Sequence, residues 1–191
     1  MNRLPALDPA TATGKSKTLL DAVQSKLGRT PNLMRTLANA PAALEAYLGF
    51  SGALATGALD AKVREQIALA VAEANVCDYC LAAHTAIGGM VGLTADEIGK
   101  ARDARSDQPK AAALLKLARS VVVHRGTVTD HELAAARAQG VTDGEVVEVV
   151  ANVALNILTN YVNPVARTVV DFPAAAPAGA GGCGTNACRS H

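Results

Sequence analysis

Apolar residues recur every three or four positions along most of this chain, which is the spacing of one face of an α-helix. In residues 61–74, for example, Val63, Ile67 and Val71 stand four positions apart, with charged and polar residues between the first two. No segment alternates apolar and polar residues as a half-buried β-strand does. The pattern therefore predicts an all-α fold.

Capping residues divide this pattern into separate helices. Asp60 is placed to cap one helix. Thr94 and Thr129 each stand three residues before a glutamate, which is the spacing of a capping box. Pro41 and Pro109 stand where helices begin. The predicted helices cover residues 15–27, 32–39, 41–54, 61–74, 77–90, 95–104, 109–125, 130–138 and 143–161.

The last of these helices is the longest and the most apolar. Valine, leucine and isoleucine occur on more than one side of it, which predicts that it is buried inside the domain or in a subunit interface. Asparagines recur along it at spacings of three or four residues, at Asn152, Asn156, Asn160 and Asn163. These amides could line an active site, hydrogen-bond with a neighbouring subunit or be solvated, and we favour hydrogen bonds with a neighbouring subunit.

The domain organisation follows from composition. Residues 15–172 are predicted to form a single helical domain, preceded by a flexible arm at residues 1–14. Residues 173–191 are rich in glycine, alanine and proline, and are expected to form a flexible tail that does not pack. The tail holds Cys183 and Cys188, which we interpret as an exposed appendage. The alternative is that these two cysteines relay disulfide exchange to the domain.

Composition and charge narrow the classes of function. Of the 191 residues 50% are hydrophobic but only 3% are aromatic, so alanine, leucine and valine must fill the core. A formal charge of +1 predicts no electrostatic binding to nucleic acid or to an anionic membrane. No apolar run approaches the roughly 18–20 residues of a membrane span, and the first residues lack the apolar core of a signal peptide. We expect a cytoplasmic protein.

The strongest chemical signal is a C-x-x-C pair, Cys77 and Cys80, followed by His84. At about 100° per residue these three side chains fall within about 60° of one helix face, and Cys80 and His84 are direct neighbours. A helix start lowers the pKa of a thiol, and the thiolate is the reactive form. In a reducing cytosol such a pair is more often redox-active or metal-binding than structural. We predict a redox-active pair with His84 as the base beside Cys80.

Glu65 joins this site only if the chain reverses between two helices. On one continuous helix it would lie about 18 Å from Cys77. With a break near Asn75 and an antiparallel return, Glu65 and His84 come to the same level, and the carboxylate can orient the imidazole. The predicted relay is Glu65, His84 and Cys80, with Cys77 as the second thiol.

The motif E-x11-C-x-x-C-x3-H, in the context EQIALAVAEANVCDYCLAAH, resembles the carboxymuconolactone decarboxylase / alkylhydroperoxidase D-like family and in particular its peroxidase-related branch. The resemblance is strongest over about residues 40–125. It implies a compact multi-helix domain with the C-x-x-C at the start of a core helix. It also implies a homo-oligomer, either a trimer or a hexamer.

The same resemblance implies a function. Thiol-active members of the family reduce alkyl hydroperoxides, so it implies a peroxidase in which Cys80 attacks, Cys77 resolves, and His84 and Glu65 relay the proton. It implies no metal, flavin or haem, and it implies a dithiol, a thioredoxin-like protein or a lipoyl-bearing protein as the reductant. Where the best-studied type has a histidine, this chain has Tyr79, which cannot act as a base near neutral pH. We assign Tyr79 to packing or to a subunit contact.

Other interpretations of these residues stay open. The cysteines could be buried packing residues, or could bind zinc with His84 and Glu65, although zinc usually needs a second chelating segment. The dithiol could also serve a non-peroxidatic disulfide relay or a redox sensor. A decarboxylase acting on a lactone acid is disfavoured because that activity of the family does not use a C-x-x-C.

Overall fold

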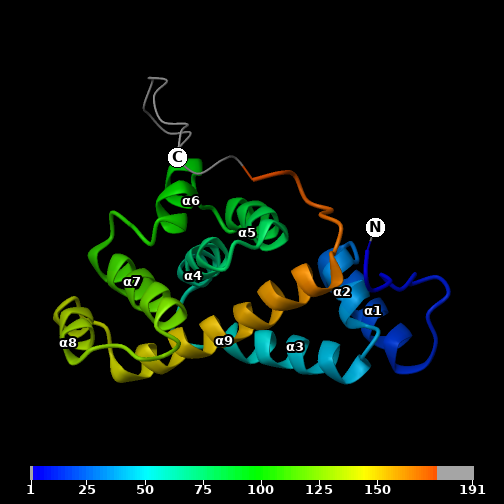
Figure 1. Cartoon of the computed structure of the whole chain (residues 1–191), viewed down its shortest axis with the longest axis horizontal. Coiled ribbons are helices and arrows are strands. Elements are labelled where there is room, and N and C mark those ends of the chain that lie inside the picture. Colours follow the sequence, from blue (N-terminus) through cyan, green and yellow to red (C-terminus); the bar gives the residue numbers. More distant parts are fainter. Residues whose placement is uncertain (1, 176–191) are drawn as a thin grey trace.

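The computed structural model describes residues 2–175, which form helices and contain no β-strand, so the predicted all-α fold is confirmed (Figure 1). In chain order the helices are α1 (Gly14–Leu27), α2 (Asn32–Leu37), α3 (Pro41–Leu54), α4 (Ala61–Ala74), α5 (Asp78–Met90), α6 (Ala95–Arg102), α7 (Pro109–Val123), α8 (Asp130–Ala138) and α9 (Asp143–Ala166). Cys183 and Cys188 lie outside the described residues. Within residues 2–175, no helix combines the length and the apolar character that crossing a membrane requires.

Most helix boundaries lie within two residues of the sequence prediction, and two of the differences concern the cysteine pair and the asparagine row. α5 begins at Asp78, so Cys77 precedes the first turn as its N-cap. α9 continues to Ala166, past the predicted end at residue 161, with Pro164 inside its last turn. The residue before a proline disfavours the α conformation, so the local preference is for a helix that ends before Pro164. Here Asn163 and Ala166 are buried on the inner face of the helix, and this burial outweighs the local preference.

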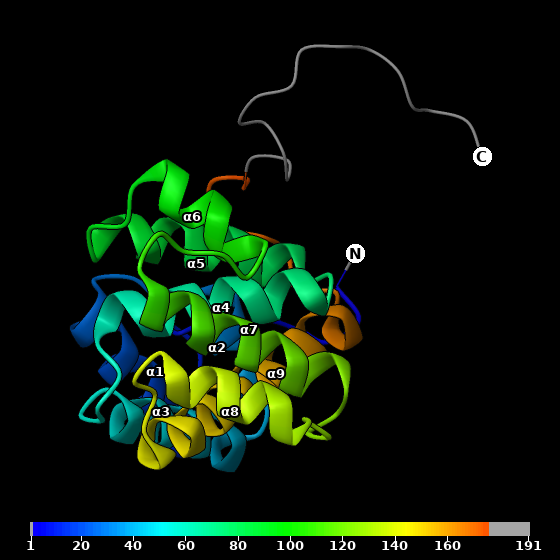
Figure 2. The ribbon, with the colours of Figure 1, turned by 90° about the vertical axis from the view of Figure 1, so that its left-hand side faces the viewer.

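Helix α4 is the central element of the molecule. It packs against α5, α6, α7 and α9. Figure 2 shows α4 and α7 between the layer of α5 and α6 and the layer of α3, α8 and α9. Leu69 of α4 belongs to an apolar cluster shared with α7 and α9, whereas Ala72 belongs to a second cluster with α1, α2, α3 and α5. Both cysteines of the C-x-x-C pair lie in this second cluster.

Side-chain caps start several of the helices. Thr94, Thr129 and Thr142 each accept a hydrogen bond from the N–H of a glutamate three residues on, whose carboxylate bonds back to the threonine N–H. The Asp60 carboxylate accepts the N–H of Val63 at the start of α4. A cap of this kind contributes about 1 kcal/mol to stability. The sequence therefore specifies where these helices begin.

The segments at both ends of the described chain lie against α2. The Leu7 N–H donates to the Arg35 carbonyl at 3.1 Å, and the Arg35 guanidinium donates to the Leu7 carbonyl at 2.8 Å. Beyond α9, the Asp171 carboxylate accepts the N–H of Asn32 at 3.0 Å and the hydroxyl of Tyr79 at 2.8 Å. The second contact fixes the segment that follows α9 to the first turn of α5.

Candidate active site

The chain reverses between α4 and α5 over Asn75, Val76 and Cys77, where the sequence predicted a break. Val76 has a φ of 53°, a left-handed conformation that β-branched residues rarely adopt. The N–H of Cys77 donates to the Ala72 carbonyl in the last turn of α4 at 3.0 Å. This turn lays α5 alongside α4 and leaves Cys77 at its start.

Cys77 and Cys80 face each other across the first turn of α5. Their Sγ atoms are 2.7 Å apart, and both cysteines are free. The two residues are buried, at 3% and 2% exposed. Because the sulfurs already adjoin, the pair can close to a disulfide with little movement of the backbone.

Hydrogen bonding separates the two thiols in acidity. The hydrogen bond from the Cys80 side chain lowers the pKa of Cys77 to about 7 against the opposing effect of burial, and the Cys80 N–H lowers it further. The same side-chain contact, together with burial, raises the pKa of the Cys80 thiol. These directions favour a thiolate on Cys77, whereas the sequence led us to expect the attacking thiol at Cys80. The side-chain contact between the two cysteines is the main cause, and the capping position adds to it because the Cys77 sulfur accepts the Cys80 N–H of the first turn.

Glu65 and His84 meet beside the cysteine pair. The Glu65 Oε2 lies 2.8 Å from the His84 Nδ1, and both side chains are mostly buried. Burial lowers the pKa of His84, but the charge of Glu65 and its hydrogen bond raise it more, so the net pKa lies above the ordinary 6.5. The charges of His84 and Cys77 also stabilise each other. The contact that required the chain reversal is thus present, and its role in proton transfer stays a prediction.

Two asparagines of α9 reach the same site, which is one of the roles that the sequence left open for the row but not the role we favoured. The Asn163 Nδ2 lies 3.2 Å from the Cys80 Sγ and 3.9 Å from the Cys77 Sγ. The Asn160 Oδ1 accepts a hydrogen bond from the Asn75 Nδ2 at 2.9 Å. The expectation that the asparagine row of α9 bonds with a neighbouring subunit is wrong, because no member of the row is more than 6% exposed within this chain. The sequence could have indicated this burial, because the asparagines lie on the same face of α9 as valines that are buried.

Tyr47 of α3 is a further neighbour of the site. The sequence presented it only as one apolar position of a helix. Burial, together with the charges of Glu65 and Cys80, raises the pKa of Tyr47 to about 12. Its hydroxyl is therefore protonated at neutral pH and lies in the field of the carboxylate and the thiol. Helical periodicity cannot distinguish such a residue from an ordinary core position.

Tyr79 packs within the chain, which is one of the two roles expected for it. Its hydroxyl accepts the N–H of Leu33 at 3.1 Å and donates to Asp171 at 2.8 Å. Its ring meets the ring of Phe172 edge-on, with the centroids 5.7 Å apart. Burial raises the pKa of Tyr79 above its ordinary value. Tyr79 therefore joins α5 to α2 and to the segment after α9.

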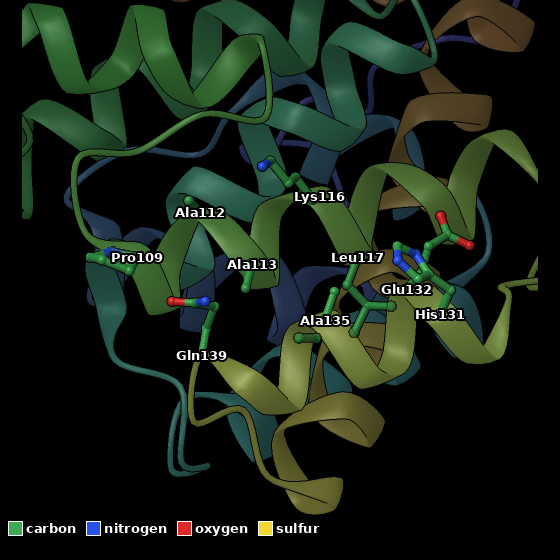
Figure 3. Close-up of a pocket in the computed structure, with 10 residues that line it drawn as sticks. Pro109, Ala112, Ala113, Lys116, Leu117, His131, Glu132, Ala135 and Gln139 are labelled. Atoms are coloured by element: carbon green, nitrogen blue, oxygen red, sulfur yellow. The ribbon is translucent and has the colours of Figure 1, made fainter.

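Two cavities of the described structure lie away from the thiol site. One of about 430 Å³ lies between α7 and α8, with Lys116, His131 and Gln139 among its lining residues (Figure 3). Another of about 320 Å³ lies beside the first turns of α4 and α7. Neither is lined by a residue of the thiol site. Over residues 2–175, no group of three or more histidines, cysteines, aspartates or glutamates is arranged to hold a metal ion.

Comparison with known proteins gives this site a family context. Residues 41–120 match the model of the carboxymuconolactone decarboxylase family. The matched segment runs from the start of α3 into α7 and contains Glu65, both cysteines and His84. Over this segment the chain is similar to the carboxymuconolactone decarboxylase family. A comparison with curated protein sequences found no match.

Solved structures of the family's fold resemble the whole domain. An alkylhydroperoxidase AhpD core, from an uncharacterized peroxidase-related protein of Ralstonia eutropha JMP134, is 28% identical with a TM-score of 0.77, covering 89% of this chain and 92% of that chain. A peroxidase-related protein from Silicibacter sp. TM1040 is 22% identical with a TM-score of 0.73, covering 87% and 89%. The debrominase Bmp8, solved as its C82A variant with 2,3,4-tribromopyrrole, is 16% identical with a TM-score of 0.75, covering 88% and 91%. The chain therefore has the alkylhydroperoxidase D-like fold, which a debrominase shares.

Proposed function

We propose that the protein is a thiol-dependent peroxidase that reduces alkyl hydroperoxides, and also hydrogen peroxide, through a dithiol–disulfide cycle of Cys77 and Cys80. The observation that carries the proposal is a pair of free sulfurs 2.7 Å apart beside a hydrogen-bonded Glu65 and His84. Similarity to a peroxidase-related protein at 28% identity supports it. Because the fold also serves a debrominase, the proposal rests on the site rather than on the fold.

In the proposed cycle, Cys77 opens the reaction because its pKa of about 7 makes it the thiolate. Its sulfur attacks the terminal oxygen of the hydroperoxide, the O–O bond breaks, and the alcohol leaves as an alkoxide. The imidazolium of His84 donates its proton to the alkoxide, and Glu65 holds that imidazolium in place. The products of this step are an alcohol and a sulfenic acid on Cys77.

Cys80 then resolves the sulfenic acid. Its thiol sulfur attacks the sulfur of Cys77, the hydroxyl group leaves as water, and a disulfide forms. An external dithiol, carried by a small molecule, a thioredoxin-like protein or a lipoyl-bearing protein, reduces this disulfide through a mixed disulfide and becomes oxidised itself. The proton that leaves the restored Cys77 thiol returns to His84. Each turnover thus consumes one hydroperoxide and one dithiol.

Single-cysteine variants test this proposal. We expect Cys77→Ser and Cys80→Ser each to reduce the consumption of tert-butyl hydroperoxide, with dithiothreitol as reductant, to the background rate. Cys80→Ser should accumulate a sulfenic acid on Cys77, which a dimedone probe traps. The double variant Cys183→Ser/Cys188→Ser is the matched control, and should keep wild-type turnover if these cysteines are an appendage. Full turnover in either single variant of the C-x-x-C pair would refute the dithiol cycle.

A redox sensor is a second candidate, and the burial of the two sulfurs favours it. At 3% and 2% exposed, they receive a peroxide only when the surrounding helices open locally. A sensor needs only one oxidation, whereas an enzyme needs this opening at every turnover. Peroxide consumption limited to one equivalent per chain, with excess dithiothreitol present, would favour the sensor over the peroxidase.

A further inference from the structure

The asparagine row of α9 divides into two functionally different halves. At about 100° per residue, its four members lie within about 80° of one another on the helix. Asn152 and Asn156 donate their side-chain amides to carbonyls of their own helix, those of Glu148 and Asn152, both at 2.8 Å. Asn160 and Asn163, one turn further on, point their side chains at the segment that carries the cysteines.

Asn163 makes the closest approach of any amide to the reacting atoms. Its Nδ2 lies 3.2 Å from the Cys80 Sγ and 3.9 Å from the Cys77 Sγ, so that one NH₂ group faces both sulfurs. The residue is only 3% exposed, and water therefore does not replace this donor.

One atom of the inner half lacks a partner. The Asn163 Oδ1 is buried without a hydrogen bond to any described residue. Leaving a buried polar atom unpaired costs about 1–3 kcal/mol. A leucine would fill the same space without that cost. Uncompensated polar atoms of this kind are uncommon in folded proteins and call for a functional explanation.

An N–H group discriminates between the two redox states of the pair. A thiolate is a strong acceptor of an N–H hydrogen bond, whereas the sulfur of a disulfide is a weak one. An amide placed between the sulfurs therefore stabilises the reduced state more than the oxidised state. Stabilising the reduced form of a dithiol raises its reduction potential.

We propose that Asn163 is a catalytic residue of the thiol site, whose side-chain amide hydrogen-bonds the thiolate of the Cys77–Cys80 pair and thereby raises the reduction potential of its disulfide. The directions in which Asn163 shifts the pKa values of the two cysteines agree with this proposal. Behind the hydrogen bond from Cys80, Asn163 contributes to lowering the pKa of Cys77, and Asn163 and Asn160 both oppose the rise in the pKa of Cys80. The raised potential makes the disulfide easier for an external dithiol to reduce.

This inference rests on the proposed redox cycle but not on the identity of its oxidant. The balance of the measured reaction is simple: the Cys77–Cys80 disulfide takes two electrons and two protons from dithiothreitol, which closes to its cyclic disulfide. Alkylation and redox equilibria require no hydroperoxide. A failure of peroxidase turnover therefore leaves the test of Asn163 standing, and the two outcomes are separable.

The experiment compares the wild type with Asn163→Leu and Asn163→Ala, using Asn152→Ala as the matched control on the same helix face. Two quantities are measured: the pH dependence of iodoacetamide alkylation, located by mass spectrometry, and the thiol–disulfide equilibrium in dithiothreitol buffers. We expect both Asn163 variants to move the alkylation midpoint to higher pH. We also expect the equilibrium to shift about tenfold toward the disulfide, a change of about −30 mV in potential. Asn152→Ala should change neither quantity.

Wild-type values of both quantities in a folded Asn163 variant would overturn the inference. Should neither variant fold, the wild type itself supplies the test through NMR of its side-chain amides. The Asn163 amide signals should move downfield on reduction of the disulfide, while those of Asn152 stay in place. Identical Asn163 signals in the two redox states would overturn the inference equally.

Discussion

At the scale of single residues, the contacts of the two thiols differ. The Cys77 sulfur receives the Cys80 N–H at 3.4 Å and lies 2.7 Å from the Cys80 sulfur. The side-chain contact is the main cause that lowers the pKa of Cys77, and the backbone N–H adds to it. The sequence prediction relied instead on the i,i+4 neighbourhood of Cys80 and His84. A C-x-x-C motif therefore locates a redox pair in the sequence, whereas the difference between its two thiols also depends on where the helix begins.

The pH profile of the reaction belongs to this scale. Turnover should rise with pH through about 7 as Cys77 becomes the thiolate. The rate should fall again at higher pH, because His84 loses the proton that the leaving alkoxide needs. The midpoint of this fall should lie above 6.5, the ordinary pKa of histidine. The initial rate of hydroperoxide reduction measured across pH checks both limbs.

Replacing Glu65 tests which group sets the falling limb. Glu65→Gln removes the charge that raises the pKa of His84, so the falling limb should move to lower pH while the rising limb stays near 7. Glu73→Gln is the matched control on α4, because Glu73 pairs with Arg102 instead of His84. A falling limb that is identical in Glu65→Gln and in the wild type would show that His84 is not the acid.

At the scale of elements, the turn between α4 and α5 builds the site. The sequence located this break from the residues around Asn75, and the contact between Glu65 and His84 follows from it. The sequence did not favour Asn163 or Tyr47 as site residues, because they lie far from the motif in the sequence and only the packing of α9 and α3 brings them to it. Local spacing can fix partners on one helix or across one turn, whereas partners from distant helices depend on the tertiary fold.

The strained residue in this turn gives a stability prediction. Val76 has a φ of 53° and is 83% exposed, so it bears a conformational cost without packing in return. We expect Val76→Asn to raise the free energy of unfolding by about 1 kcal/mol, since asparagine tolerates the left-handed region. Urea unfolding followed by circular dichroism measures the change. Val123→Asn, an exposed position at the regular end of α7, is the control and should bring no gain; destabilisation by Val76→Asn would contradict the argument.

At the scale of the whole molecule, α9 has two opposite faces. The inner face carries buried valines and the asparagine row. The outer face exposes a row of large apolar side chains, made up of Val147, Val150, Leu158, Tyr161 and Val165. At about 100° per residue this row falls within about 80° of the helix surface. The sequence predicted burial of this helix from its apolar character, and the structure shows that the chain itself buries only one side.

We expect the outer row to be covered by a second copy of the chain, in the trimer or hexamer that the family resemblance implied. The double variant Tyr161→Glu/Val165→Glu should dissociate this assembly, because it places charges in the apolar outer row. Size-exclusion chromatography with light scattering measures the mass. Lys116→Glu, at an exposed position of α7, is the control. A wild type that is monomeric at micromolar concentration would contradict this expectation.

If Cys77 and Cys80 form one redox unit, a hydroperoxide oxidises them together to a disulfide. Titration of the reduced protein with a single equivalent of tert-butyl hydroperoxide, followed by alkylation and peptide mass spectrometry, tests this. We expect that one equivalent consumes both thiols, releases one tert-butanol and links Cys77 to Cys80. Two alkylated cysteines after the titration, or a sulfinic acid on one of them without a disulfide, would contradict it.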